Sequence, residues 1–393
     1  MPRTRFRVVL AVLASVAFAE LAYARVKLIS LPARDRVEIR LENQNATMIE
    51  EERTVPLVKG LNQVDFSWAN TRIDPDTIVF RIIDSTGEVN VLSVSYPPKE
   101  SALIWNVAAE NAGPARVRIS YLIGQLSKSS NYRAIAARDE KTLRLAHFVK
   151  LRNDAPETFG ESGIWLGADK RIERPIAGDQ TRELLVERWN AVPIVKTFTA
   201  DVQKHGWQNQ AQNKVKVAMH YVLSNERAAG LGATTLPYGK VRIFQQDSRG
   251  GNAFLGEDWG KRTAPGAKMQ LFLGQSRDIA VKRTIERNTR ERIEGNLYNQ
   301  HVVLRYEIEN FKDVAAELRI HEAVGRIRSE FLGKPAHQDT QWEVGDETTF
   351  PGRVDAQETD IKRVAVRAKL PPAQDAKAQK QTYLLHLIFR NEW

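Results

Sequence analysis

The chain has 393 residues, a formal net charge of +10, 27% charged residues and no cysteine. A sequence without cysteine excludes disulfide scaffolds, thiolate zinc sites, iron–sulfur clusters and cysteine nucleophiles. The length predicts two or three domains, at about 100–200 residues each. A hydrophobic share of 42% is typical of a globular protein.

The N-terminal 24 residues have the pattern of a secretory signal peptide. Three arginines within the first seven residues precede an apolar run from Val8 to Ala19, which is too short to span a bilayer. Ala22 and Ala24 fit the small-x-small cleavage pattern, so we expect cleavage before Arg25. The pattern predicts export, to the periplasm or the cell surface. No later stretch approaches eighteen consecutive apolar residues, so we expect no transmembrane segment in the mature chain.

The charge distribution argues against a nucleic-acid partner. Removing the leader takes away three arginines and one glutamate, which lowers the formal charge of +10 by 2, to +8. Nucleic-acid-binding proteins usually gather Lys and Arg on one face or in a tail. The densest basic stretch here, 282–294, also contains three glutamates. We interpret this stretch as a solvated charged surface.

The body of the chain reads as short strands with turn residues between them. Residues 37–41 alternate apolar and polar side chains, as a half-buried strand does. Segments 77–83 and 89–96 flank a turn and predict a β-hairpin. Segment 180–190 fits a helix or a strand, and no other segment after the leader predicts an amphipathic helix of two turns. Further strands are expected near 50–59, 61–66, 103–108, 115–123, 142–151, 163–166, 192–198, 214–223, 240–245, 253–255, 269–273, 279–285, 301–308, 315–321, 360–366 and 381–390.

This spacing predicts an all-β protein: two or three consecutive antiparallel β-sandwich domains after a cleaved signal peptide. The glycine-rich segment 225–239 is a candidate junction. With the leader at 1–24, the expected division is an N-terminal domain at 25–113, a middle β domain at 114–230 and a C-terminal sandwich at 231–393. Segment 371–380 is polar and predicts an exposed hairpin loop.

Several short blocks in the second half carry a family resemblance. They are LPYGKVRIF at 236–244, FLGED at 254–258, LFLG at 271–274 and DIAV at 278–281, followed by IHE at 320–322. Their order resembles the bacterial secreted family known as domain of unknown function 4139, the mucoidy-inhibitor-like proteins, from about residue 115 onward. Many members carry a coiled-coil insertion, and 25–113 has no heptad pattern. The resemblance implies an all-β fold, export and a loose link to exopolysaccharide, but no particular activity.

The same blocks can also be interpreted as folding signals. Gly239 and Gly256 stand beside alternating apolar residues, so we expect both to adopt positive φ where strands turn.

No motif in the sequence establishes a catalytic, cofactor or metal site. His321 and Glu322 begin a zinc-protease pattern, but position 325 is glycine where the second histidine would stand. His301 and His321 lie on consecutive expected strands and could meet across a hairpin, although zinc needs three or four ligands. We therefore expect no catalytic residues, cofactor or metal.

Tryptophans are the remaining candidates for ligand contact. Trp105 and Trp165 lie in apolar strand contexts and are expected in the core. Trp207 and Trp259 lie in polar surroundings and are the candidates for surface binding. We expect a non-enzymatic interaction or structural protein of the envelope that binds a protein or polysaccharide partner. The alternative is an envelope glycan hydrolase that uses a carboxylate pair, because such a pair leaves no sequence motif.

Overall fold

The computed structural model describes residues 26–41, 43, 46–68, 71–167, 170–202, 207–334, 340–353, 363–374 and 377–393. These residues form strands almost throughout, which confirms the all-β prediction. The expected cleavage residues Ala22, Ala24 and Arg25 lie outside the described residues. In the described part, no helix has the length and apolar character needed to cross a membrane.

The chain divides into two compact units, each built from two segments. Unit 1 comprises Met1–Lys128 and Leu151–Arg182, and unit 2 comprises Ser129–Lys150 and Glu183–Trp393. The boundaries expected at 113 and 230 both fall inside a unit.

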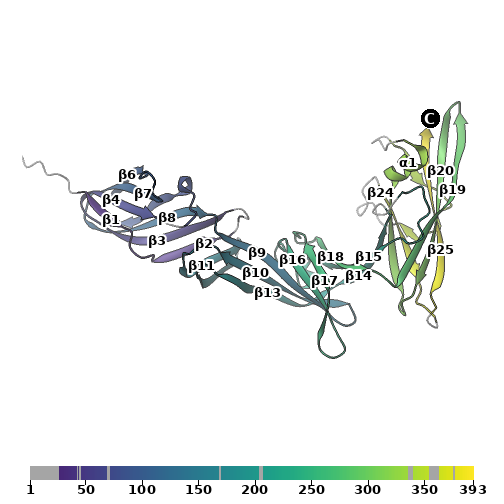
Figure 1. The fold of residues 1–393 in the computed structure, drawn as a ribbon, viewed down its shortest axis with the longest axis horizontal. Helices are drawn as coiled ribbons and strands as arrows, with labels where there is room; N and C mark the ends of the chain where they lie inside the picture. The colour runs from purple at the N-terminus through teal and green to yellow at the C-terminus, as the bar shows by residue number, and fades with distance from the viewer. Residues whose placement is uncertain are drawn as a thin grey trace, which may run out of the picture. The chain divides into compact units, whose positions relative to one another are not determined.

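Unit 1 contains a four-stranded and a six-stranded sheet (Figure 1). The first has the order β1-β4-β7-β6, and the second β12-β11-β2-β3-β8-β5. The Phe66 ring of β4 lies 5.6 Å from the Tyr121 ring of β8, so aromatic side chains join the two sheets. The strands are β1 (Lys27–Ser30), β2 (Arg36–Arg40), β3 (Thr47–Leu57), β4 (Gly60–Ser67), β5 (Val79–Ser85), β6 (Val89–Ser95), β7 (Ala102–Ala109), β8 (Gly113–Ile123), β11 (Phe159–Gly167) and β12 (Lys170–Ile176).

The expected hairpin between β5 and β6 is wrong, although both strands form. β5 pairs with β8 in the six-stranded sheet, whereas β6 pairs with β7 in the four-stranded sheet. The turn between them carries the chain from one sheet to the other. The sequence signal for a hairpin is local, but the pairing is decided by which sheet buries each strand.

Unit 2 contains three sheets and, among the described residues, one α-helix, α1 (Val324–Leu332). Their strand orders are β13-β10-β9-β16-β17, β18-β15-β14-β21-β24-β23 and β19-β20-β25-β22. The strands are β9 (Leu126–Ala136), β10 (Thr142–Asn153), β13 (Thr181–Pro193), β14 (Val195–Asp201), β15 (Val217–Ser224), β16 (Gly239–Gln246), β17 (Asn252–Gly260), β18 (Lys268–Gln275), β19 (Ile279–Glu294), β20 (Leu297–Asn310), β21 (Ala316–Ala323), β22 (Trp342–Val344), β23 (Gly352–Arg353), β24 (Arg363–Leu370) and β25 (Gln379–Glu392).

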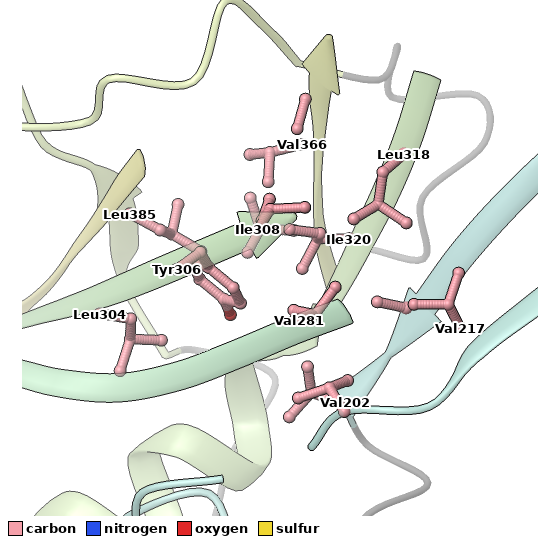
Figure 2. Close-up of a cluster of buried hydrophobic side chains, with 14 of the residues drawn as sticks. Val202, Val217, Val281, Leu304, Tyr306, Ile308, Leu318, Ile320, Val366 and Leu385 are labelled. Carbon is pink, nitrogen blue, oxygen red and sulfur yellow. The ribbon is translucent and has the colours of Figure 1, made fainter. Parts of the chain in front are cut away.

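Two hydrophobic cores fill unit 2. The first joins the five-stranded sheet to β15 and β18, with Tyr132, Val241, Tyr221 and Leu271 among its buried members. The second joins the four-stranded sheet to β21 and β24. Figure 2 shows side chains such as Leu304, Ile320, Val366 and Leu385 converging in it. β15 contributes to both cores, with Val217 in the second and Tyr221 and Leu223 in the first, so this strand connects them.

Three further sequence expectations have clear outcomes here. Residues 181–190 lie in strand β13, and the C-terminal segment is strand β25, which lies between β20 and β22 and is buried in its middle part. Segment 371–380 joins β24 and β25, which lie in different sheets, so it is not a hairpin loop between paired strands.

Helix α1 is missing from the sequence prediction. Its apolar side chains Val324 and Ile327 are buried, and Gly333 ends it with a φ of 72°. The i, i+3 spacing and the terminal glycine were signals for a helix. With only nine residues, the helix is too short for that pattern to stand out against the neighbouring strands.

Candidate binding surface

The outward side of β16 and β17 gathers aromatic and charged side chains. In β16, Val241 and Ile243 are fully buried, so the intervening residues point outward. The antiparallel register places Lys240 opposite Trp259 and Arg242 opposite Glu257. Directly opposed residues share one side of a sheet. We call this surface the aromatic face; it comprises Tyr238, Lys240, Arg242, Phe244, Phe254, Glu257 and Trp259.

Trp259 and Tyr238 form a parallel ring stack at one end of the aromatic face. Their ring centroids are 5.1 Å apart and their planes differ by 5°. Parallel carbon planes touch at about 3.5 Å, so the two rings are laterally offset and neither completely covers the other. About half of each side chain remains exposed, 50% for Trp259 and 52% for Tyr238. The stack is therefore a preformed apolar platform in contact with solvent.

A charged group lies beside the stack. Lys240 Nζ is 2.7 Å from Glu257 Oε1 and 5.4 Å from the centroid of the Trp259 ring. The hydrogen bond from Lys240 lowers the pKa of the Glu257 carboxyl, and Arg242, with Nε 3.9 Å from Oε2, acts in the same direction. Glu257 therefore stays ionised and holds the lysine ammonium close to the tryptophan ring.

A β-bulge shapes the other end of the aromatic face. The register shifts between Ile243 and Phe244, where Gly256 has a φ of 156°. This value confirms the expected positive φ at Gly256. The bulge sets Phe254 opposite Phe244, with ring centroids 5.4 Å apart, and Phe254 is 59% exposed.

The expectation for Gly239 is wrong, because this residue has no positive φ. A Cβ at this position would lie 2.3 Å from the carbonyl oxygen of Ser130 in β9. Glycine is required there by the close approach of two backbones, and not by a turn.

The two candidate tryptophans lie on different elements. Trp207 is 63% exposed and follows β14, where its carbonyl accepts a hydrogen bond from Gln212 at 3.1 Å. Trp259 belongs to the aromatic face. Of the tryptophans expected in the core, Trp105 is buried, whereas the Trp165 indole donates to Glu38 at 2.6 Å in a charged surface cluster.

His301 meets His386 of β25 and not His321. Nδ1 of His301 lies 3.0 Å from Nε2 of His386, and its Nε2 lies 3.1 Å from Glu291. The two facing nitrogens share one hydrogen bond, in which one ring donates and the other accepts. Within the described residues, no cluster of three or more histidine or acidic side chains has the arrangement of a metal site.

Glu322 of the zinc-like pattern lies in a buried ionic cluster. Its carboxylate accepts hydrogen bonds from the Arg283 guanidinium at 2.7 Å and from the Tyr306 hydroxyl. Arg283 also donates to the carbonyl of Gln208 at 2.6 Å. Arg283 and Glu322 have fully buried side chains, so Arg283 departs from the solvated surface expected for 282–294, whereas residues 286–294 are exposed as expected. Burial and the adjacent carboxylate raise the pKa of Tyr306, so its hydroxyl stays protonated.

A groove of about 570 Å³ lies in unit 2. Its walls come from β14, β15, β18 and β21, together with the turn around Ala228. Glu226 is the single carboxylate that lines it in the described part of the chain, and Lys261, Lys268 and Arg319 are its cations.

Comparisons with known proteins do not identify this chain: no protein-family model matches the sequence, and no curated protein matches it significantly.

Proposed function

We propose that this protein is an exported envelope protein that binds a polysaccharide on its aromatic face without catalysing a reaction. The parallel Trp259–Tyr238 stack carries this proposal. The C–H faces of pyranose rings pack against flat aromatic rings, which supply a large apolar surface with few rotatable bonds. Lys240, Arg242 and Glu257 lie on the same side of the sheet and offer hydrogen-bonding groups to sugar hydroxyls.

Two further observations support a glycan ligand. Half of each stacked ring is exposed, although burial would stabilise both rings. The face also has aromatic pairs at both ends, separated by about 15 Å at the usual rise of a strand. Such spacing suits a chain of several sugar residues better than a compact small molecule. The resemblance to the mucoidy-inhibitor-like family, which remains a prediction, agrees with an envelope role.

The hydrolase alternative has less support among the described residues. A glycosidase needs two carboxyl groups flanking the bond, and a general acid with a raised pKa. The groove offers the single carboxylate Glu226. Every carboxyl of the described residues with a shifted pKa has it lowered, as at Glu257, Glu291 and Glu392.

The binding proposal is tested with the mature chain and a panel of soluble neutral and acidic polysaccharides in affinity electrophoresis. Trp259→Ala is expected to weaken retardation by about tenfold, equivalent to about 1.4 kcal/mol, because it removes a central aromatic contact. Trp207→Ala is the matched control, since it removes an exposed tryptophan ring elsewhere in unit 2. Equal loss in both variants, or no retardation of the wild-type protein by any polysaccharide, contradicts the proposal.

The export part of the proposal has its own test. We expect cell fractionation to recover the protein outside the cytoplasm, with Arg25 as its N-terminal residue by Edman degradation. A cytoplasmic chain that retains residues 1–24 overturns it.

A further inference from the structure

We propose that the groove beside the aromatic face binds a negatively charged sugar residue, so that the polysaccharide of the proposed function is an acidic one. This inference rests on the proposed function for its sugar component. The groove itself supplies the argument for negative charge.

The charge of the groove favours an anion. Lys261 and Lys268 line it, and none of the salt bridges among the described residues involves either lysine. Arg319 adds a third positive charge, and Glu226 supplies one negative charge. A concave surface lined by one sign of charge raises the local concentration of oppositely charged ligands.

A buried hydroxyl in the groove points to a polar ligand atom. Thr197 lines the groove and is 8% exposed, and its Oγ1 has no hydrogen-bond partner among the described residues. Buried hydroxyls nearly always have a partner, because an unpaired one loses its hydrogen bonds to water. Its Oγ1 is covered by protein, so a rotation of the Thr197 side chain toward the groove would let a ligand oxygen supply the missing bond.

The remaining lining fits a sugar ring better than an inorganic ion. Val195 and Val222 lie opposite each other on β14 and β15, on the same side as Thr197, and Val195 is 64% exposed. Gln270 lies opposite Val222 on β18. An apolar patch flanked by an amide, a hydroxyl and lysines matches a ring that has a C–H face, hydroxyl groups and an acidic substituent.

The groove and the aromatic face share an edge at Lys261. The Leu236–Thr263 bridge and the Gly239–Gly260 pair continue one register, which sets Lys261 opposite Tyr238. Lys261 therefore lies on the side of the sheet that carries Trp259, and it also lines the groove. A single polysaccharide chain can stack on Trp259 and place its next acidic residue beside Lys261.

The test uses isothermal titration of the mature chain with three tetrasaccharide probes: a galacturonate, a sulfated galactan and neutral cellotetraose. We expect both acidic probes to bind more tightly than the neutral one, with an advantage that shrinks as salt increases. A stronger preference for one acidic probe identifies the substituent as carboxylate or sulfate. Equal affinity for acidic and neutral probes overturns the inference and leaves the proposed function standing.

Matched lysine variants test whether the preference for acidic probes arises in the groove. The double variant Lys261→Ala/Lys268→Ala is expected to lose about three- to tenfold in affinity for the acidic probe, the size of two exposed ion pairs, and to bind the neutral probe normally. Lys214→Ala/Lys216→Ala removes the same charge from exposed positions of unit 2 outside the groove. An equal loss in both double variants overturns the assignment to the groove.

Thr197→Val separates a ligand contact from a structural role. Because its hydroxyl has no partner, we expect the melting temperature to stay the same or rise, while the affinity for the acidic probe falls. A fall in melting temperature with unchanged affinity overturns the assignment of Thr197. If acidic probes bind through the lysines but Trp259→Ala has no effect, the proposed function fails and the anion site remains.

Discussion

Glu322 shows that a residue in an incomplete metal-binding pattern can have a structural role. It follows His321 as in a metal-binding pattern, yet its carboxylate lies fully buried against Arg283 and Tyr306. Nη2 of Arg283 and Oε2 of Glu322 lack hydrogen-bond partners among the described residues. A buried pair of this kind depends on both members, because removing one charge leaves the other uncompensated.

Replacing Glu322 by glutamine is expected to destabilise the protein by about 3–5 kcal/mol, since it leaves the Arg283 charge buried and unpaired. Urea denaturation followed by circular dichroism measures the change. Glu286→Gln is the control, because it breaks the exposed pair with Arg305 at 2.6 Å and should hardly move the midpoint. Similar urea midpoints for the two variants would show that the buried pair contributes no more to stability than the exposed pair.

The His301–His386 pair predicts how stability depends on pH. Burial lowers the pKa of His386 below its usual 6.5, an effect that Glu347 partly opposes. The unfolded chain therefore binds a proton more readily than the folded one, and the free energy of unfolding falls as the pH drops through 6.5. Carboxyl groups with lowered pKa, such as Glu38 at about 2, lose their stabilising effect only below about pH 4.5.

Melting temperatures between pH 7.5 and pH 5 test this expectation. The wild-type protein should melt at a lower temperature at pH 5, and His386→Gln should flatten the profile in this range. A profile that is equally steep in the variant would assign the effect to other groups.

At the scale of elements, β9 and β16 depend on a single glycine. These parallel neighbours align Gly239 with Ser130, and a Cβ would lie 2.3 Å from the Ser130 carbonyl oxygen. The clash involves backbone, which cannot move as a side chain does. β16 also carries half of the aromatic face, so its position determines the orientation of that surface.

Gly239→Ala is expected to lower the free energy of unfolding by about 1–3 kcal/mol, the usual range for overpacking a close contact. It should also weaken glycan binding, because β16 shifts relative to β17. Gly124→Ala is the control, since nothing lies within 4 Å of its added Cβ. Equal stability of both variants, measured by urea denaturation, would refute the close-contact argument.

The sequence predicted most of the strands, although it missed β9 and β12, and it predicted strand partners poorly, for a physical reason. Alternation reports burial of one side of a strand, so β2, β10 and β25 were recognisable. Pairing depends on distant segments, and β5 and β6 were assigned to one hairpin because the turn between them was the only local signal. Trp259 was predictable as an exposed aromatic residue. Its stack with Tyr238 could not be predicted, because it depends on the register of β16 against β17. The groove could not be predicted either, because four strands from separate parts of the chain form it.

At the scale of the whole molecule, the two units are interleaved in sequence. The chain leaves unit 1 after Lys128, contributes 129–150 to unit 2, and returns to unit 1 at Leu151. The domain expected at 25–113 ends where β8 begins, although β8 lies between β3 and β5 in the six-stranded sheet. A linear division of this chain therefore separates strands that belong to one sheet.

This interleaving predicts the behaviour of fragments. Residues 25–113 lack β8, β11 and β12, so we expect no cooperative unfolding transition in urea. Residues 25–182 contain all strands of unit 1 and should unfold cooperatively. A cooperative transition in the shorter fragment would show that three strands of the six-stranded sheet are dispensable.

The position of β9 has a consequence for the order of events during synthesis. β9 leaves the ribosome about 100 residues before β16, its parallel neighbour. Until then one edge of β9, with Tyr132 and Ala134 beside it, lacks the strand that will cover it. An unpaired strand edge of this kind can join other nascent chains. The interval between these two strands is therefore where a chaperone would protect the unfolded chain most effectively.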